Sequence, residues 1–366
     1  MDKIKRVGHL YGNLLSFDNV NEAYRVVRGK CRNKRIILRF DLHRNINLYN
    51  ILFDLHYKRY ELGWYNIFII NEPKYRLIMS ENIRDKVVNH LISSTILIRA
   101  LDKKLIYSNV ATRVGKGSGL ANDLLMKYLS NILLKHRKVY CLKMDVKKYF
   151  YNIDHDILKR MLKQDIKDKD ALDIVFKVID STDEDYVNEE IDRVRYREIE
   201  RVKALNICNK EKDKKIKELM GIPLYDKGNG LGIGNMTSQI LAVYYLSEVD
   251  HFIKEGLGVK YYIRYMDDLV ILDSDYEYLK FVYDMVGRKM NEYGLTLNSK
   301  SGIHELSRGF SFLGYTYKLS NRIVIRVNNA TYRRVSKHLS SLIKYDKEMF
   351  KRSLVSYKGF FSRCNV

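Results

Sequence analysis

Two adjacent carboxylates, Asp267 and Asp268, stand between two runs rich in aromatic and β-branched residues. These runs, Tyr261–Met266 and Leu269–Leu272, predict two short β-strands that meet at a tight turn. Successive side chains of a strand point to opposite faces, so neighbouring acids can share one site only where the chain bends. Because the flanking residues are apolar, the turn would hold both acids at the edge of a core, where they require a cation.

A third carboxylate, Asp145, ends the apolar run Val139–Asp145, which predicts another strand, and no arginine within a turn is placed to neutralise it. Two Mg²⁺ ions between such acids would hold a nucleoside triphosphate, polarise an attacking 3′-hydroxyl and stabilise the leaving pyrophosphate. Phosphoryl transfer needs little beyond this positioning and charge. The nearby Asp154 fits the N-cap of the helix that follows, and we assign it no chemistry.

Glycine-rich segments precede two predicted helices. Thr112–Gly119 is basic and can bring backbone N–H groups and a cation to a phosphate, although Gly-Lys-Gly is also an ordinary turn. Gly230–Gln239 leads into an apolar-periodic helix at 240–254, with Thr237–Gln239 available as caps. Glycines at this helix start form a surface that a flat group, such as a base pair, can approach closely.

The elements that must position these residues are mixed in type. Helical spacing is predicted for residues 14–60, 82–92 and 276–293, and again from 330 onward; strands are predicted at 64–70, 75–79, 294–300 and 309–317. The basic run Arg28–Arg35 is interpreted either as a solvated loop or as a contact to backbone phosphate.

Residues 183–220 are dense in both charges and predict helix. The acidic group Glu189, Glu190 and Asp192 resembles a metal site in composition, but such a run is typical of a solvated helix stabilised by i,i+4 ion pairs. We interpret the segment as an insertion that could hold an accessory protein, an RNA or a second copy of the chain.

Composition narrows the partners. The chain has 366 residues, 46% of them hydrophobic, so it can bury a large core and is not a disordered tail. Its net charge of +22 favours a polyanionic partner such as nucleic acid. The alternative is a generally basic surface from an AT-rich genome. The four scattered cysteines predict a reducing cytosol and no zinc site. With no apolar amino-terminal leader and no membrane-length run, we expect a cytoplasmic protein without membrane contact.

The order of these signals resembles the reverse transcriptase family, in particular bacterial enzymes with a group II intron-like palm. The similar motifs, in chain order, are Asp145–Phe150, Gly232–Gln239, Tyr265–Asp268, Leu297–Lys300 and Phe312–Tyr315. The resemblance implies an α+β fold of the right-hand polymerase type. Fingers would span 1–130, a palm with an antiparallel sheet 131–317, including the insertion near 183–220, and a short helical thumb 318–366.

The resemblance also implies site roles. Asp145, Asp267 and Asp268 would bind two Mg²⁺ ions, with Mn²⁺ as an alternative, and Lys300 would be a general acid for pyrophosphate. Phe150 would exclude a 2′-hydroxyl and so select deoxynucleotides. The residues implied to contact the nucleotide are Arg76, Arg113, Ile233, Gly234, Ser238 and Gln239. The residues implied to form the primer grip are Phe312, Leu313, Gly314 and Tyr315.

The form Ile233–Gln239 of the second motif is similar to enzymes of diversity-generating retroelements and to antiviral, defence-associated reverse transcriptases. The resemblance thus implies an RNA-directed DNA polymerase, a nucleotidyltransferase that uses dNTPs, an RNA template, a DNA or RNA primer and a dedicated non-coding RNA. Two other hypotheses remain open: an untemplated or protein-primed DNA polymerase, and an inactive RNA-binding scaffold. Intact acids and Lys300 argue against the scaffold, because carboxylates repel RNA.

Overall fold

The computed structural model describes residues 6–31, 33–71 and 74–365. Residues 1–5, Arg32 of the basic run, residues 72–73 and residue 366 lie outside the described residues. The chain divides into two compact units. The first unit comprises Met1–Ile106, Lys147–His251 and Lys289–Thr296; the second unit comprises Tyr107–Val146, Phe252–Arg288 and Leu297–Val366.

The first unit begins with a series of helices. They are η1 (Tyr11–Leu15), α1 (Phe17–Lys30), α2 (Lys34–Leu42), α3 (Arg44–His56), α4 (Ile83–Ile92), η2 (Ser93–Leu97), α5 (Ile98–Leu101) and η3 (Asp102–Lys104). Helical spacing is confirmed here, since Val20, Tyr24 and Val27 are buried on one side of α1. The basic run is not one loop, because α1 continues to Lys30 and α2 starts at Lys34, where Asn33 caps it.

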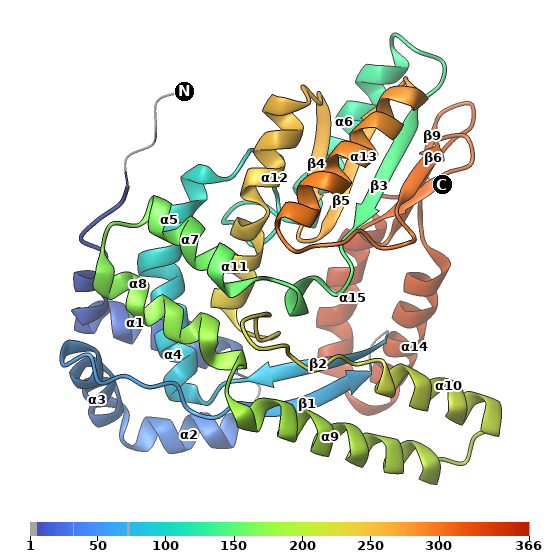
Figure 1. Cartoon of the computed structure of the whole chain (residues 1–366). Coiled ribbons are helices and arrows are strands. Elements are labelled where there is room, and N and C mark those ends of the chain that lie inside the picture. The colour runs from blue at the N-terminus through green and yellow to red at the C-terminus, as the bar shows by residue number, and fades with distance from the viewer. Residues whose placement is uncertain (1–5, 32, 72–73, 366) are drawn as a thin grey trace. The chain divides into compact units, whose positions relative to one another are not determined.

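A two-stranded antiparallel sheet in the first unit packs against two charged helices (Figure 1). Strands β1 (Asn66–Asn71) and β2 (Tyr75–Ser80) share a buried cluster with α9 (Asp185–Ala204) and α10 (Asn209–Met220). The predicted helical insertion is therefore confirmed as helical, with one face in a core. On its outer face, Glu190 pairs with Arg193 and Arg197, as expected for a solvated face.

The other elements of the first unit precede and follow the glycine-rich segment in the sequence. They are η4 (Tyr149–Tyr151), α7 (His155–Asp165), α8 (Lys169–Ile179), η5 (Asp180–Thr182), α11 (Met236–Tyr245) and α12 (Ser247–His251). Asp154 caps α7 as predicted, its carboxylate accepting from the Ile157 N–H at 2.8 Å. The caps predicted for α11 are wrong: Asn235 is its N-cap, and Thr237 and Ser238 lie buried inside the helix.

The second unit contains an antiparallel sheet with strand order β4-β5-β3-β6 (Figure 1). Its strands are β3 (Tyr140–Asp145), β4 (Tyr261–Tyr265), β5 (Asp268–Asp273) and β6 (Gly302–Glu305). Helix α6 (Ser118–Leu133) packs on β4 and β5, and its apolar residues share a buried cluster with Cys141, Ile263 and Val270. Two further helices flank β4 and β5 in the sequence: η6 (Phe252–Gly256) precedes β4, and α13 (Tyr276–Glu292) follows β5.

A second antiparallel sheet of this unit has the strand order β7 (Phe310–Phe312), β8 (Tyr315–Leu319), β9 (Ile323–Val327). Two helices follow it in the sequence, α14 (Asn329–Tyr345) and α15 (Lys347–Phe361). The strand predicted at 294–300 is wrong: only Leu297 pairs there, with Val146, and the regular strand starts at Gly302. Strand β9 was not predicted. Among the described residues, no helix is both long and apolar enough to span a membrane.

Candidate active site

The pairing of β3 with β5 brings two of the three predicted carboxylates together. Asp145, at the end of β3, stands directly opposite Asp268, the first residue of β5. Asp268 also pairs with Tyr265 of β4, which leaves Met266 and Asp267 as the two residues of the hairpin turn. All three acids therefore belong to the second unit and meet at one end of its four-stranded sheet.

A buried arginine, which was not among the residues predicted from the sequence, forms a hydrogen bond to the backbone of the hairpin turn. Met266 adopts a left-handed φ of 56°, which is uncommon for a residue with a side chain. Arg264 of β4 is fully buried, and its Nη1 donates to the Met266 carbonyl at 2.9 Å. A charged residue inside the apolar run 261–265 was the available signal, because a buried arginine must find acceptors.

Polar side chains surround the paired acids. Asn298 Nδ2 donates to Asp145 Oδ2 at 3.1 Å, and the Ser301 hydroxyl accepts from the Asp145 N–H at 3.1 Å. Lys143 Nζ lies 3.5 Å from Asp268 Oδ1. Burial raises the pKa of Asp268; Lys143 opposes this shift, whereas Asp145 adds to it. An acid whose charged form is disfavoured in this way gains from a bound cation.

The donor set fits Mg²⁺. Three carboxylates at one sheet end supply the hard oxygen ligands that this ion prefers, and burial, which raises the pKa of Asp268, makes a charged acid there costly without a cation. Lys300 is exposed on the turn after Leu297, and its N–H donates to Asn298 Oδ1 at 3.2 Å. Within this fourth motif it is Asn298 that contacts an acid, through the hydrogen bond to Asp145, and the sequence pattern did not indicate this role.

Phe150 lies in the first unit, on the short helix η4 (Tyr149–Tyr151). Its carbonyl accepts from the Leu231 N–H at 2.7 Å, and the Ile153 carbonyl accepts from the Gly230 N–H at 2.8 Å. The neighbouring Tyr149 is buried and donates its hydroxyl to the Ala242 carbonyl. The segment that follows Asp145 is therefore fixed to the glycine-rich segment and to α11.

The glycine-rich segment also joins the β1–β2 sheet. The Met79 N–H donates to the Ile233 carbonyl at 2.8 Å. Gly234 has a φ of 130°, and a Cβ there would lie 3.0 Å from the Met79 carbonyl oxygen, so this close approach requires glycine. Of the other two candidate nucleotide contacts in this motif, Gln239 is exposed and Ser238 is buried.

The two candidate arginines lie in different units. Arg76 is exposed on β2 in the first unit. Arg113 belongs to the second unit, in the loop before α6, and its Nη1 donates to the Asn109 carbonyl at 3.1 Å. Their proposed contact with a triphosphate stays a prediction.

The predicted primer grip forms a β-hairpin. Leu313 and Gly314 are its two turn residues, with φ values of 47° and 88°, and they join β7 to β8 through the pair Phe312–Tyr315. Tyr315 donates its hydroxyl to the Phe360 carbonyl at 2.8 Å and stacks on the Phe360 ring at 4.4 Å. The hairpin is therefore anchored on α15, and a Cβ at Gly314 would meet the Phe360 ring at 3.2 Å.

The sequence profile of the family described as Reverse transcriptase (RNA-dependent DNA polymerase) matches residues 70–317, more than half of the chain. The chain belongs to the reverse transcriptase family. The match includes the three acids, the glycine-rich segment and the hairpin of Phe312–Tyr315. The predicted α+β fold class is confirmed, and no curated protein sequence matches the chain.

Solved structures with a similar fold include telomerase from Candida albicans in complex with the TWJ fragment of telomeric RNA, with 13% identity and a TM-score of 0.43. Another is apo telomerase from Candida tropicalis truncated from its C-terminal domain, with 14% identity and a TM-score of 0.46. The matches cover 74% and 78% of the present chain, but only 46% and 60% of the telomerase chains. The chain thus spans less than two thirds of these telomerase structures.

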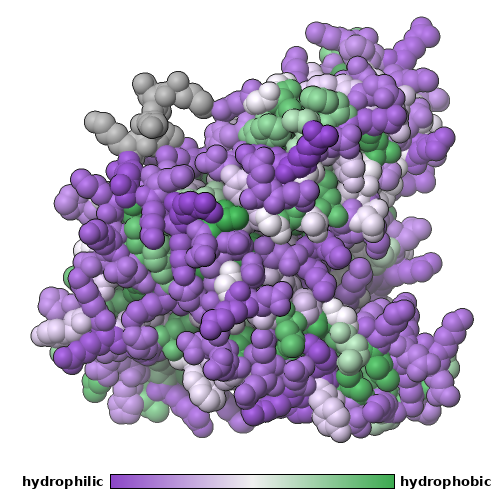
Figure 2. Space-filling model, in the orientation of Figure 1, coloured by the Kyte–Doolittle hydropathy of each residue, from purple (hydrophilic) through white to green (hydrophobic). Residues whose placement is uncertain are grey.

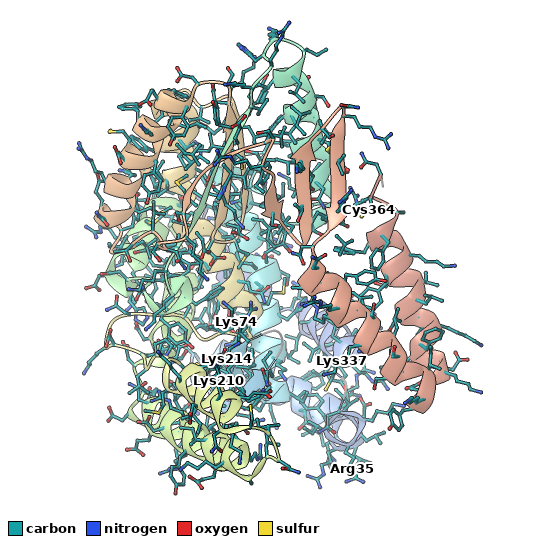
Figure 3. The ribbon with its side chains drawn as sticks, turned by 90° about the vertical axis from the view of Figure 1, so that its right-hand side faces the viewer. Arg35, Lys74, Lys210, Lys214, Lys337 and Cys364 are labelled. Atoms are coloured by element: carbon teal, nitrogen blue, oxygen red, sulfur yellow. The ribbon has the colours of Figure 1, made fainter. Side chains whose placement is uncertain are left out.

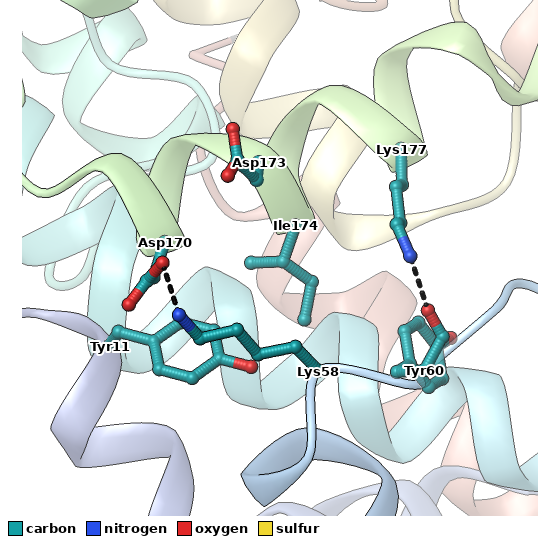
Figure 4. A pocket seen from close by; sticks show the side chains of 7 residues that line it. All are labelled: Tyr11, Lys58, Tyr60, Asp170, Asp173, Ile174 and Lys177. Carbon is teal, nitrogen blue, oxygen red and sulfur yellow. Dashed lines mark hydrogen bonds and ion pairs between the residues drawn. The ribbon is translucent and has the colours of Figure 1, made fainter.

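A cavity of this reverse transcriptase's first unit carries no chemistry that we can assign (Figure 4). Its volume is about 180 Å³, and two of its lining residues, Lys58 and Lys177, make polar contacts within the lining. Lys58 lies 2.6 Å from Asp170, and Lys177 donates to the Tyr60 carbonyl at 2.8 Å. These contacts close the cavity and favour a structural role.

Replacing Arg264 by methionine should loosen the turn that carries Asp267. Hydrogen bonds from charged donors are worth about 1.5–3 kcal/mol, so we expect the free energy of unfolding to fall by that amount. The Mg²⁺ concentration for half-maximal polymerase activity should rise, because the turn is no longer fixed. Urea unfolding and a Mg²⁺ titration measure the two effects, and Arg288→Met on the exposed side of α13 is the control. An unchanged Mg²⁺ requirement would restrict Arg264 to a stabilising role.

Replacing Asp268 by asparagine should stabilise the metal-free protein. Like charges directly opposite on a sheet cost roughly 0.2–1 kcal/mol, and Asp145 faces Asp268. The folded pKa of Asp268 lies above its unfolded value, so its stabilising contribution is present at low pH and lost as pH rises through the folded pKa. The gain from Asp268→Asn should therefore be larger at pH 7 than at acidic pH.

Urea unfolding with EDTA at both pH values measures this gain. The exposed Asp284→Asn on α13 is the matched control and should change neither value. Equal stability of Asp268→Asn and the native chain at pH 7 would show that repulsion at this site is negligible.

Proposed function

We propose that the chain is an RNA-directed DNA polymerase that adds dNTPs to a primer by two-metal phosphoryl transfer. The observation that carries this proposal is the β3–β5 register, which places Asp145 opposite Asp268 with Asp267 in the adjoining turn. A chain of the reverse transcriptase family that keeps three acids together at a sheet end retains the ligands that this chemistry needs.

Asp145, Asp267 and Asp268 would hold two Mg²⁺ ions, with Mn²⁺ as an alternative. Bound there, the ions would supply Lewis-acid activation and charge neutralisation for phosphoryl transfer. Asn298 orients the Asp145 carboxylate, and Arg264 holds the turn that carries Asp267. We assign Lys300 as proton donor to pyrophosphate, because it is an exposed cation on the segment that orients Asp145.

The remaining assignments follow the same proposal. Phe150 would exclude ribonucleotides, and its anchored backbone supports such a steric role. Arg76, Arg113 and the second motif would contact the nucleotide. The hairpin Phe312–Tyr315 would grip the primer, with its turn fixed against α15. We keep fingers, palm and thumb at 1–130, 131–317 and 318–366 as the functional division.

A nucleic acid partner is supported by charge. The net charge of +22 suits a polyanion. The face shown in Figure 2 is mostly hydrophilic. Lys74, just before β2, and Lys210 and Lys214, on α10, are exposed and are labelled in Figure 3. We infer that α10 and Lys74 present cations to a template or non-coding RNA, in a diversity-generating retroelement or in an antiphage defence system.

The test is to purify the chain with the nucleic acid that it carries from its native locus, add Mg²⁺ and labelled dNTPs, and sequence any product. DNA that matches a co-purified RNA, and that is absent with Asp267→Ala, would support the proposal and identify the template. Adenine-specific errors would favour a diversity-generating role. Product without an RNA counterpart would favour untemplated or protein-primed synthesis, and no incorporation under any condition would favour an RNA-binding scaffold.

A further inference from the structure

A buried histidine of the first unit faces two carboxylates that the polymerase chemistry does not use. His155 is the first residue of α7, Asp180 begins η5, and Asp183 directly follows η5. The side chain of His155 is only 2% exposed, whereas Asp180 and Asp183 are 43% and 22% exposed. The three palm acids belong to the second unit, so this cluster contains none of them.

The hydrogen bonding of His155 determines which ring nitrogen carries the proton. Its Nε2 lies 2.7 Å from the Gly230 carbonyl oxygen, which can only accept, so Nε2 is the donor. In the neutral ring, Nδ1 then presents a lone pair. This buried Nδ1 has no hydrogen-bond partner, and it points at Asp180 Oδ1 and Asp183 Oδ2. Three electron-rich atoms therefore face one another, and a cation bound between them would offset their mutual repulsion.

The distances suit a metal ion better than hydrogen bonds. Nδ1 lies 3.3 Å from Asp180 Oδ1 and 3.4 Å from Asp183 Oδ2, longer than a usual N–H···O contact of about 2.7–3.2 Å. A tetrahedral ion with metal–ligand bonds of about 2.0–2.1 Å holds its ligand atoms roughly 3.4 Å apart. All three ligand atoms lie within 4.8 Å of one another.

Each of the three side chains is oriented by a further polar contact, as metal ligands usually are. A ligating histidine usually donates its other ring N–H to a carbonyl or carboxylate, and Gly230 accepts here. Asp183 Oδ1 accepts from the Gly228 N–H at 2.8 Å, which fixes that carboxylate with Oδ2 toward the histidine. Lys159 Nζ contacts both oxygens of Asp180, at 2.5 and 2.7 Å, and so orients it while partly neutralising it.

We propose that His155, Asp180 and Asp183 bind one Zn²⁺ ion, with water as the remaining ligand. Mixed imidazole and carboxylate donors, with both Nδ1–oxygen distances near the tetrahedral value, favour Zn²⁺ over Mg²⁺. Asp180 lines a surface cavity of about 380 Å³ together with Trp64 and Phe176, which gives the ion a route from solvent. The scattered cysteines predicted no zinc site, but this cluster uses none of them and its residues are separated in sequence.

The ion would fix the start of the glycine-rich segment. Gly228 accepts from the His155 N–H at 2.9 Å, and Gly230 accepts from both the His155 ring and the Thr182 hydroxyl. Leu231, the next residue, donates to the Phe150 carbonyl. A metal at His155 therefore ties α7, η5 and the segment 228–231 together, and we assign it a structural role.

The test is metal uptake by the full chain, purified without a histidine tag and stripped with EDTA. After dialysis against Zn²⁺, elemental analysis should find one ion per chain, and substitution with Co²⁺ should give the visible absorption of a tetrahedral site. His155→Gln and Asp183→Asn should each reduce the affinity at least about tenfold. The exposed neighbour substitution Asp156→Asn should leave uptake unchanged. Repeating the series in an Asp267→Asn background removes a ligand of the polymerase site, and the loss of affinity caused by His155→Gln should persist there, which separates the two sites.

Three results would overturn the proposal. They are no Zn²⁺ uptake by the native chain, equal uptake by His155→Gln, or ¹⁵N shifts showing both nitrogens of His155 protonated in the presence of Zn²⁺. The last result would mean that a proton is the bridging cation. If circular dichroism shows that His155→Gln does not fold, two other measurements decide the outcome. One is Zn²⁺ uptake by Asp180→Asn, which removes one charge but keeps a side chain that can bind Lys159. The other is the ¹⁵N measurement on the native chain.

Discussion

Alanine at Asp267 is expected to reduce DNA synthesis by at least about three orders of magnitude and to leave RNA binding unchanged. Metal-based charge stabilisation is worth several kcal/mol, and each 1.4 kcal/mol corresponds to a tenfold change in rate. Asp267 occupies the hairpin turn beside Asp268, so its removal takes away a ligand without cutting into the sheet. Single-turnover primer extension with labelled dNTPs measures the rate.

RNA binding is measured separately, by fluorescence anisotropy at two salt concentrations. Because the chain carries a net charge of +22, affinity should fall steeply with salt, and equally for native and variant protein. Asp284→Ala on the exposed side of α13 is the matched control and should leave both rate and affinity unaltered. Joint loss of synthesis and RNA binding in Asp267→Ala would mean that the acid is structural.

Replacing Phe150 by alanine is expected to admit ribonucleotides, lowering the preference for dNTPs over rNTPs by roughly 100-fold. The aromatic ring is the bulk that would meet a 2′-hydroxyl. The backbone of Phe150 is fixed through Leu231 and its neighbour Tyr149 is buried, so the truncation should not move the segment. The ratio of kcat/KM for a matched dNTP and rNTP, measured on one template and primer, gives the preference.

Phe150→Tyr keeps the bulk at this position and should retain the native preference. Asp267→Ala serves as the background for contaminating polymerases. If Phe150→Ala and the native chain choose between dNTP and rNTP equally, the exclusion of the 2′-hydroxyl lies elsewhere. In that case the second motif, whose Ile233 accepts from the Met79 N–H, would be the next segment to test.

The sequence by itself determined the elements with strong local signals. The aromatic and β-branched runs around Asp267 gave a hairpin, and Asp154 capped its helix, because these features depend on neighbouring residues. The charged segment at 183–220 formed helices with paired outer charges for the same reason. The three acids could be chosen because a carboxylate at the end of an apolar run is costly without a cation.

Only the tertiary structure decided which distant residues meet. The β3–β5 register, which sets Asp145 against Asp268, depends on long-range pairing that no local pattern encodes. The same applies to Asn298 on Asp145: that stretch was predicted as a strand, but its backbone and side chain bind Asp145 instead. His155, Asp180 and Asp183 converge only because α7 and η5 pack beside Gly228–Gly230, and hydrogen bonds made across the fold, not spacing along the chain, aim them at one point.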